Sequence, residues 1–474
     1  MSKLYSAILR SVSGRFSTYL IQFGALAIYA RMFSPNEFGI IASIQVFVVF
    51  FQMLADVGIG PAIINEKGFG QERRDGIFTV TALLGVVISI AFYFFSFLLN
   101  GFYNGYEYQS IAILVCVAIF FNALNIVPLA SLNKDTKFTH IAVVDIFVEV
   151  IALILVYFLY TKQVGVLSLA ARPMIQAMSR FVIFWILSVN TTIGRPCFGN
   201  EIYHFKSILE FSSYQFGFNF INYFSRNLDN ILVAKYFGMI TIGVYEKSYQ
   251  LMRYPLMVTT FAMAPAIQPV LTCVRDDVKY VVCEHNKLAS RLFALSLLIS
   301  VFFFINSQDL ILFLFGERWL DIVPLIQIFS LSIPLQSVLS TSGAFFQVMN
   351  KPKLLFFSGV LSAVFNVLAI VIGIYLGNVK YVALALLASF TINFFQSYWI
   401  LFKFCFKSNI FKFYSSLIRG CMSVIVPLLV YLTLYTSGFL NFEFLPFFNL
   451  VINAILIFVF IAVTFKYTKR LLLI

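Results

Sequence analysis

Residues 226–265 read RNLDNILVAKYFGMITIGVYEKSYQLMRYPLMVTTFAMAP, and this stretch decides how the rest of the chain is interpreted. It begins polar and then becomes an apolar span that carries Glu246, Lys247 and Arg253 inside or beside it. Charged side chains are costly in hydrocarbon unless they pair with one another or face water. The ionisable residues of this stretch are therefore candidates for function.

The same stretch has a partner near the N-terminus. Residues 30–33 (ARMF), 38–39 (FG) and 60–63 (GPAI) match residues 234–237 (AKYF), 242–243 (IG) and 264–267 (APAI), all at an offset of 204 residues. Further along the chain the offset is 217 residues, which places Glu149 opposite Asn366. The sequence therefore predicts a parallel repeat of six spans followed by six, and transporters commonly place their site between such halves.

Composition assigns the chain to the membrane. Of its 474 residues, 61% are hydrophobic and 11% charged, whereas soluble proteins have roughly 45–50% apolar and about 25% charged residues. The net charge of +13 does not indicate nucleic-acid binding, because the charges separate apolar spans and form no basic face. The six Cys residues are scattered without a CxxC pair, so neither a disulfide framework nor a metal site is expected.

Apolar runs long enough to cross a bilayer as helices recur along the whole length. We expect an all-α polytopic membrane protein with about fourteen spans, near 12–33, 38–63, 77–99, 109–131, 139–160, 164–188, 207–225, 240–272, 287–306, 321–348, 354–376, 380–402, 413–437 and 445–465.

These spans group into four parts. We expect an N-lobe over 1–190, a cytoplasmic linker over 191–206, a C-lobe over 207–405 and two extra helices over 406–474. Most Lys and Arg residues between spans fall on the side of the N-terminus, which predicts that both termini are cytoplasmic. The loops are short, so no soluble domain is available to hold an enzyme active site.

Several motifs resemble those of the multidrug/oligosaccharidyl-lipid/polysaccharide exporter superfamily, and more narrowly its polysaccharide transporter branch. That branch includes Wzx-type O-antigen and exopolysaccharide flippases. The motifs are ARMFSPNEFGIIA (30–42) and LADVGIGPAIIN (54–65), RNLDNILVAKYFG (226–238) and GVYEKSYQLMRYPL (243–256), and FGERWLDIVPLIQIFSL (315–331) with FFQVMNKPK (345–353). The resemblance implies two pseudo-symmetric six-helix lobes around a central cavity, with two further helices outside them.

The resemblance also implies a cargo, an oligosaccharide on a polyprenyl pyrophosphate carrier. A pyrophosphate needs cations, and the planar fork of an Arg side chain suits it. Arg253 is the first candidate, because its repeat counterpart is Val49 and the shared scaffold therefore does not impose the charge. The other candidates are Arg15, Arg31 and Lys247.

Three of these cationic residues could instead have a purely structural role. Arg15 lies low in the first span, where a snorkelling side chain is common, and Arg31 lies where an interfacial anchor is expected. Arg253 has two potential ion-pair partners, Glu246 and Glu210.

Acidic residues form a second set of candidates. Asp145 and Glu149 are four residues apart and share one face of the fifth span. Arg172 and Arg180 lie in the sixth span, its expected antiparallel neighbour, so structural pairs or a proton relay both fit the spacing. Asp56, Glu210 and Glu246 are the remaining acids that could couple transport to an ion or form structural pairs.

The prediction is a flippase of the bacterial inner membrane. It would move polyprenyl-pyrophosphate-linked oligosaccharide from the cytoplasmic to the periplasmic leaflet by alternating access, as a monomer in contact with membrane lipid and with polysaccharide polymerase machinery as a further partner. No cofactor and no metal are expected, and proton, sodium or no ion are all open as the driving force. The alternatives are a cation-coupled drug antiporter of the same fold and a membrane polysaccharide polymerase or ligase.

Overall fold

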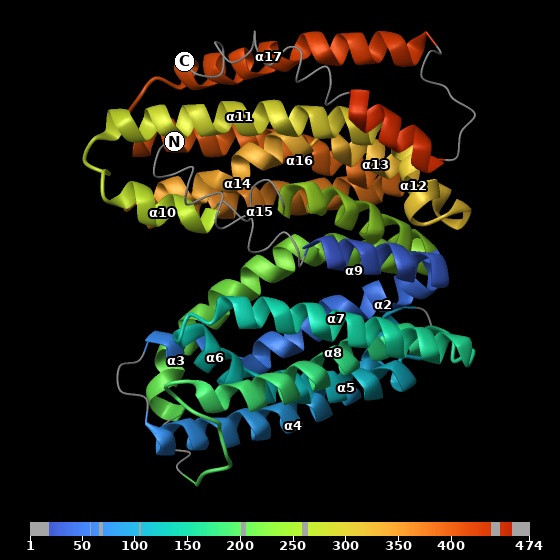
Figure 1. Ribbon diagram of the computed structural model, residues 1–474, viewed down its shortest axis with the longest axis vertical. Coiled ribbons are helices and arrows are strands. Elements are labelled where there is room, and N and C mark those ends of the chain that lie inside the picture. Colours follow the sequence, from blue (N-terminus) through green and yellow to red (C-terminus); the bar gives the residue numbers. More distant parts are fainter. Residues whose placement is uncertain are drawn as a thin grey trace. The chain divides into compact units, whose positions relative to one another are not determined.

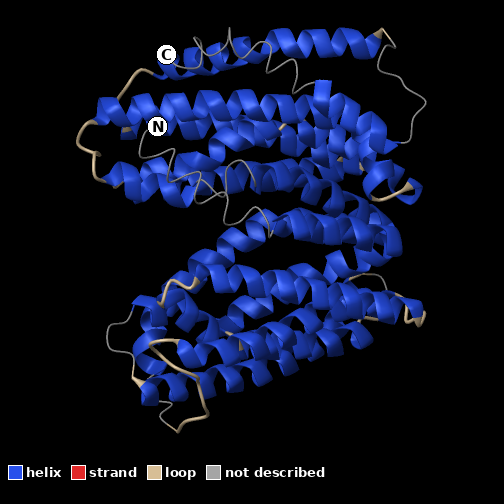
Figure 2. Cartoon of the chain, viewed as in Figure 1, coloured by secondary structure: helices blue, strands red, loops and turns tan. Residues whose placement is uncertain are grey.

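The computed structural model describes residues 19–56, 58–65, 70–103, 106–200, 205–257, 264–437 and 446–456, and every long element in these ranges is a helix (Figures 1 and 2). A helix over residues 19–32 comes first. It is followed by α2 (Pro35–Asp56), α3 (Ile59–Asn65), α4 (Gln71–Phe102), α5 (Gln109–Leu124), α6 (Ile126–Lys134), α7 (Phe138–Thr161), α8 (Val166–Leu187), α9 (Phe205–Leu256), α10 (Ala264–Thr272), α11 (Val278–Ile305), α12 (Ser307–Leu314), α13 (Val323–Ser330), α14 (Ile333–Val348), α15 (Pro352–Tyr375), α16 (Val379–Ile400), α17 (Ile410–Thr436) and a helix over Pro446–Leu456.

The helices have the length and composition of membrane spans. Within the described ranges, seven helices are long and apolar enough to cross a membrane, or eight if the bent pair Glu317–Ser330 and Ile333–Val348 forms one span. Helix is the form expected there, because a helix satisfies its backbone hydrogen bonds internally where lipid offers no partner. The protein is a multi-pass membrane protein, and the count of fourteen spans stays a prediction.

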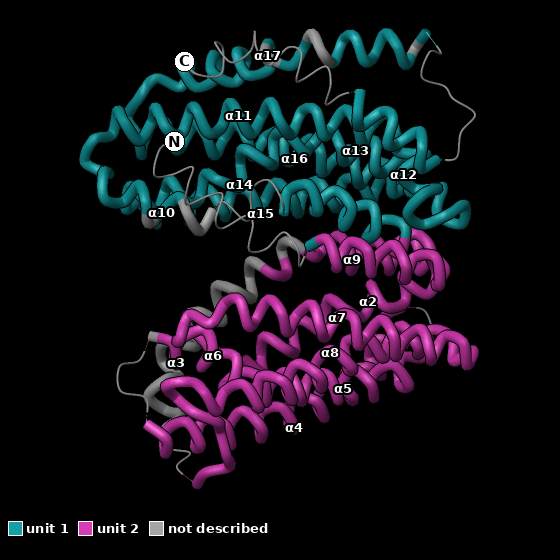
Figure 3. Tube along the Cα trace, viewed as in Figure 1, with its two compact units in different colours: residues 1–19, 244–474 teal, residues 20–243 magenta. Residues whose placement is uncertain are grey.

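The chain divides into two compact units (Figure 3). Unit 2 contains residues 20–243, and unit 1 contains residues 244–474 together with residues 1–19. The division falls inside α9, which is also broken at Gly238, where φ is 83°. The predicted lobes divide instead at 191–206, and they stay a prediction alongside these units.

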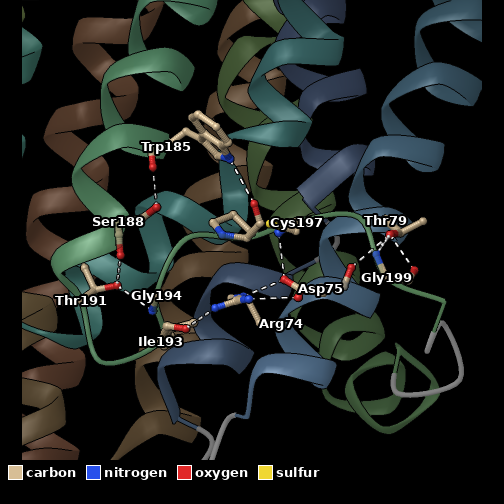
Figure 4. Close-up of polar contacts among 11 residues, drawn as sticks. Arg74, Asp75, Thr79, Trp185, Ser188, Thr191, Ile193, Gly194, Cys197 and Gly199 are labelled. Carbon is tan, nitrogen blue, oxygen red and sulfur yellow. Dashed lines mark hydrogen bonds and ion pairs between the residues drawn. The ribbon is translucent and has the colours of Figure 1, made fainter.

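The predicted linker belongs to unit 2, and part of it is hydrogen-bonded to α4 (Figure 4). Arg74 of α4 is buried, and its guanidinium donates to the carbonyl of Ile193 at 2.8 Å and to both carboxylate oxygens of Asp75 at 2.7 and 2.9 Å. Asp75 in turn accepts from the backbone N–H of Cys197 at 2.8 Å. Residues 193–197 are therefore held against the start of α4.

Two repeat-related glycines meet within unit 2. A Cβ on Gly39 of α2 would lie 1.7 Å from the carbonyl oxygen of Met239, and a Cβ on Gly243 would lie 2.0 Å from the carbonyl oxygen of Pro35. Both pairs of positions, 35 with 239 and 39 with 243, are related by the offset of 204 residues. The two repeats therefore cross here through the same backbone contact made twice, and only glycine fits at either position.

Candidate functional site

The clearest charged cluster joins α7 to α8 inside unit 2. Arg172 Nη2 lies 2.7 Å from Glu149 Oε1, and Arg180 Nη2 lies 3.0 Å from Asp145 Oδ1. Gln176 donates from Nε2 to the second oxygen of Glu149 at 2.6 Å. The structure thus brings together all four charged residues that the sequence placed on two facing helices, and it adds Gln176 to them.

The Glu149 pair is the more enclosed of the two. The side chain of Glu149 is 8% exposed and that of Arg172 is 27% exposed, whereas both partners of the Asp145–Arg180 pair are 31% exposed. The guanidinium of Arg172 also lies over the ring of Tyr29, with Cζ 4.6 Å from the ring centroid. A buried carboxylate with a cation, an amide and a ring around it is well compensated. The arrangement fits a structural ion pair, and the proton relay that the sequence left open stays a hypothesis.

A cavity of about 740 Å³ lies beside the second ion pair, within unit 2. Its size falls in the range of about 300–1,000 Å³ that is usual for ligand pockets. Segments from α2, α3, α5, α6, α7 and α8 form its wall. Its polar and charged lining residues are Gln52, Asp56, Asn122, Asn125, Asn133, Asp145 and Arg180.

Helix ends deliver two of these residues to the cavity. α2 ends at Asp56, and the carboxylate accepts a long hydrogen bond of 3.4 Å from the backbone N–H of Gly60, near the start of α3. Asn125 lies at the junction of α5 and α6, where it is 5% exposed and its Oδ1 has no hydrogen-bond partner. Asn125 was not among the residues predicted from the sequence, where its place between two apolar helical runs is the available signal.

A second cluster lies on α9 in unit 1. Lys247 is buried, with Nζ 2.7 Å from Glu246 Oε2 and 2.8 Å from Gln250 Oε1. Arg253 is exposed, and its Cζ lies 4.7 Å from the ring centroid of Tyr249. Among the described residues Arg253 has no carboxylate partner, so the ion pair with Glu246 that the sequence left open is not formed there.

The structure gives less information on the remaining candidate residues. Arg31 is an exposed residue near the end of the helix over 19–32. Arg15 lies outside the described residues, and so does the side chain of Glu210. In the part of the chain that the structure describes, no three His, Cys, Asp or Glu residues cluster as a metal site would require.

Comparison with known proteins gives this arrangement a context. Residues 28–324 match the family described as "Polysaccharide biosynthesis protein". The teichuronic acid biosynthesis protein TuaB of Bacillus subtilis is 22% identical over 84% of this chain and 82% of its own length. The lipopolysaccharide biosynthesis protein WzxC of Escherichia coli is 22% identical over 80% of this chain and 76% of its own length.

Solved structures share the fold. The lipid II flippase MurJ in an inward closed conformation superposes with a TM-score of 0.78 at 16% identity, over 98% of this chain and 100% of that one. An inward-facing multidrug resistance transporter of the MATE family and the MOP superfamily gives a TM-score of 0.65 at 13% identity, over 82% of this chain and 94% of that one. The family match covers well over half of the sequence, and the chain therefore belongs to the polysaccharide biosynthesis protein family.

Proposed function

We propose that this protein is a flippase for polyprenyl-pyrophosphate-linked oligosaccharides in the bacterial inner membrane. The observation that carries the proposal is a cavity of about 740 Å³ within a bundle of membrane helices, whose mostly apolar wall also presents carboxylate, amide and guanidinium groups. Relatives that match most of this chain support it, because two of them are named as a succinoglycan biosynthesis transport protein and as a probable flippase of glycan biosynthesis.

The cargo explains why such a protein needs polar groups in the membrane. The sugars and the pyrophosphate cannot cross hydrocarbon unaided, since each uncompensated polar group costs several kcal/mol there. The polyprenyl tail can stay in lipid throughout. A transporter that opens to each leaflet in turn therefore needs a hydrated, polar surface for the head group. It needs no binding surface for the tail.

Cations are assigned to the pyrophosphate. Arg253 is the leading residue, because it is exposed and its guanidinium has no carboxylate partner among the described residues. Arg15, Arg31 and Lys247 are assigned supporting roles. The carboxylates Asp56, Asp145, Glu149, Glu210 and Glu246 are candidates for coupling to an ion or for structural pairing, and Arg172 and Arg180 are ion-paired with Glu149 and Asp145.

The proposal includes an orientation. Both termini are placed in the cytoplasm, with transport toward the periplasm, a working monomer, and polysaccharide polymerase machinery as a partner. Reporter fusions after Lys137 and Lys353 should report the cytoplasm, and fusions after Gly101 and Gly438 the periplasm. An inverted signal at any of the four would refute the fourteen-span topology.

A cation-coupled antiporter is the second candidate. One observation favours it: the cavity in unit 2 has two carboxylates, Asp56 and Asp145, and a single cation, Arg180. Such a lining suits a cationic cargo better than a pyrophosphate. The exposed Arg253 favours the anionic cargo instead, so the two candidates differ in what they require of this residue.

Arg253 therefore provides the test. In a strain that depends on this protein for surface polysaccharide, Arg253→Ala should abolish polymer export, and Arg253→Lys should retain part of it, because Lys keeps the charge without the fork of donors. Arg419→Ala is the matched control, since Arg419 is an exposed arginine on α17 of the same unit. Membrane insertion is checked for each variant by the amount of protein in washed membranes. Full export with Arg253→Ala would remove this residue from the site.

A further inference from the structure

The cavity in unit 2 has a chemistry that the pyrophosphate does not explain. Its only cationic lining group among the described residues is the guanidinium of Arg180, which already lies 3.0 Å from Asp145. A second carboxylate, Asp56, gives the lining two acidic side chains for one basic side chain. A polyanion would be repelled here.

Amides are the remaining polar side chains of the described lining. Gln52, Asn122, Asn125 and Asn133 all line the cavity. Each amide offers a carbonyl acceptor and an NH₂ donor on one flat group, which matches the mixed donor and acceptor character of neighbouring hydroxyl groups. Carboxylates add strong acceptors for the same hydroxyls.

Asn125 supplies the observation that points to a ligand. It is 5% exposed, and its Oδ1 makes no hydrogen bond. Leaving a buried carbonyl oxygen unpaired is unfavourable, and native proteins rarely keep such groups without a reason. Because Asn125 lines the cavity, a small rotation of its amide would let a bound hydroxyl group donate to this oxygen. The carboxylate of Asp56 can also accept a further hydrogen bond, because the one that it accepts from Gly60 is long.

We infer that the cavity in unit 2 binds the sugar part of the cargo, through hydroxyl groups that donate to Asn125 and Asp56. The inference rests on the proposed function and deepens it: this cavity holds the sugars of the cargo and not its pyrophosphate. The apolar lining residues, such as Met53, Ile141 and Phe184, provide surface for the apolar faces of sugar rings.

The test compares two lipids on the same protein. Full-length protein in nanodiscs is titrated with polyprenyl pyrophosphate that carries the host's own oligosaccharide repeat unit, and with bare polyprenyl pyrophosphate. Asn125→Ala and Asp56→Asn should each weaken binding of the sugar-bearing lipid about tenfold, the loss expected for one hydrogen bond to a buried or charged group. Both should change binding of the bare lipid less than about twofold.

Matched controls lie in the same unit. Asn190→Ala and Glu107→Gln remove the same kinds of group from exposed positions outside the cavity, and both should bind the two lipids as wild type does. Should neither Asn125→Ala nor Asp56→Asn insert into the membrane, Gln52→Ala replaces them, because Gln52 is a half-buried residue of the same lining.

The outcomes separate the inference from the function on which it rests. Equal losses for both lipids, or no loss for either, would overturn the sugar site while leaving the flippase in place. Thermal stabilisation by sodium alone that disappears in Asp56→Asn would overturn it in favour of a cation site. Wild-type protein that binds neither lipid would refute the proposed function itself.

Discussion

Two helix hairpins, one in each unit, make the same contacts with different chemistry. In unit 2, Glu149 on α7 accepts from Arg172 at 2.7 Å and from Gln176 at 2.6 Å, both on α8. In unit 1, Asn366 on α15 accepts from Ser389 at 2.7 Å and from Asn393 at 3.4 Å, both on α16. Each residue of the second set follows its counterpart by 217 residues, the repeat offset found in the sequence.

Comparing the two hairpins separates what the fold requires from what it does not. The second hairpin shows that neutral hydroxyl and amide groups are enough to join two such helices. An ion pair at the same place costs more, because both charges must leave water before they can attract each other. Packing alone therefore does not explain the charges of α7 and α8, and we propose that they take part in transport.

The largest loss of stability is expected when one partner of the Glu149–Arg172 ion pair is removed. Arg172→Ala leaves the buried Glu149 without its cation and should lower the free energy of unfolding by about 3–5 kcal/mol. Ser389→Ala at the related position removes a neutral hydrogen bond and should cost only about 0.5–1.5 kcal/mol. Thermal unfolding in detergent measures both, and equal losses would erase the distinction between the hairpins.

A smaller loss of stability is expected at Gly39, where both repeats have a glycine. Gly39→Ala forces a Cβ against the carbonyl of Met239 and should cost about 1–3 kcal/mol through strain. Gly24→Ala is the control: a Cβ there meets nothing within 4 Å, and the change should be neutral or stabilising by up to about 1 kcal/mol. A neutral Gly39→Ala would mean that the repeats do not cross at this glycine.

The smallest change in stability is expected when both charges are removed together. The double substitution Glu149→Gln with Arg172→Met gives the first hairpin the neutral chemistry of the second while nearly keeping side-chain size. Unfolding should stay within about 1 kcal/mol of wild type or become harder, because no buried charge is left unpaired. Polymer export should nevertheless fall sharply. Normal export by this double variant would make the pair structural and end its assignment to transport.

The sequence predicted the charged hairpin well because the relevant geometry is local. A four-residue spacing places Asp145 and Glu149 on one helix face, and a short loop makes the next helix an antiparallel neighbour, so Arg172 and Arg180 were within reach. The helical membrane fold and its relation to polysaccharide transporters were likewise predictable from composition and motifs, and they are confirmed by the family match.

Contacts between distant segments were harder to predict. Gly39 and Gly243 were matched as repeat partners, but nothing in a sequence match says that the partners touch each other. The unpaired oxygen of Asn125 depends on how α5 and α6 meet several other helices. Glu246 pairs with the adjacent Lys247, whereas the sequence had suggested Arg253, two turns away, as a potential partner.

The central claim is tested most directly by deleting the gene in the source bacterium and analysing its lipid-linked oligosaccharides. A flippase predicts that unpolymerised repeat units accumulate on the cytoplasmic leaflet while surface polysaccharide disappears, and that the wild-type gene restores both. The accumulated lipid would also identify the cargo. Normal surface polysaccharide, together with altered sensitivity to cationic toxicants, would contradict the account and favour the antiporter.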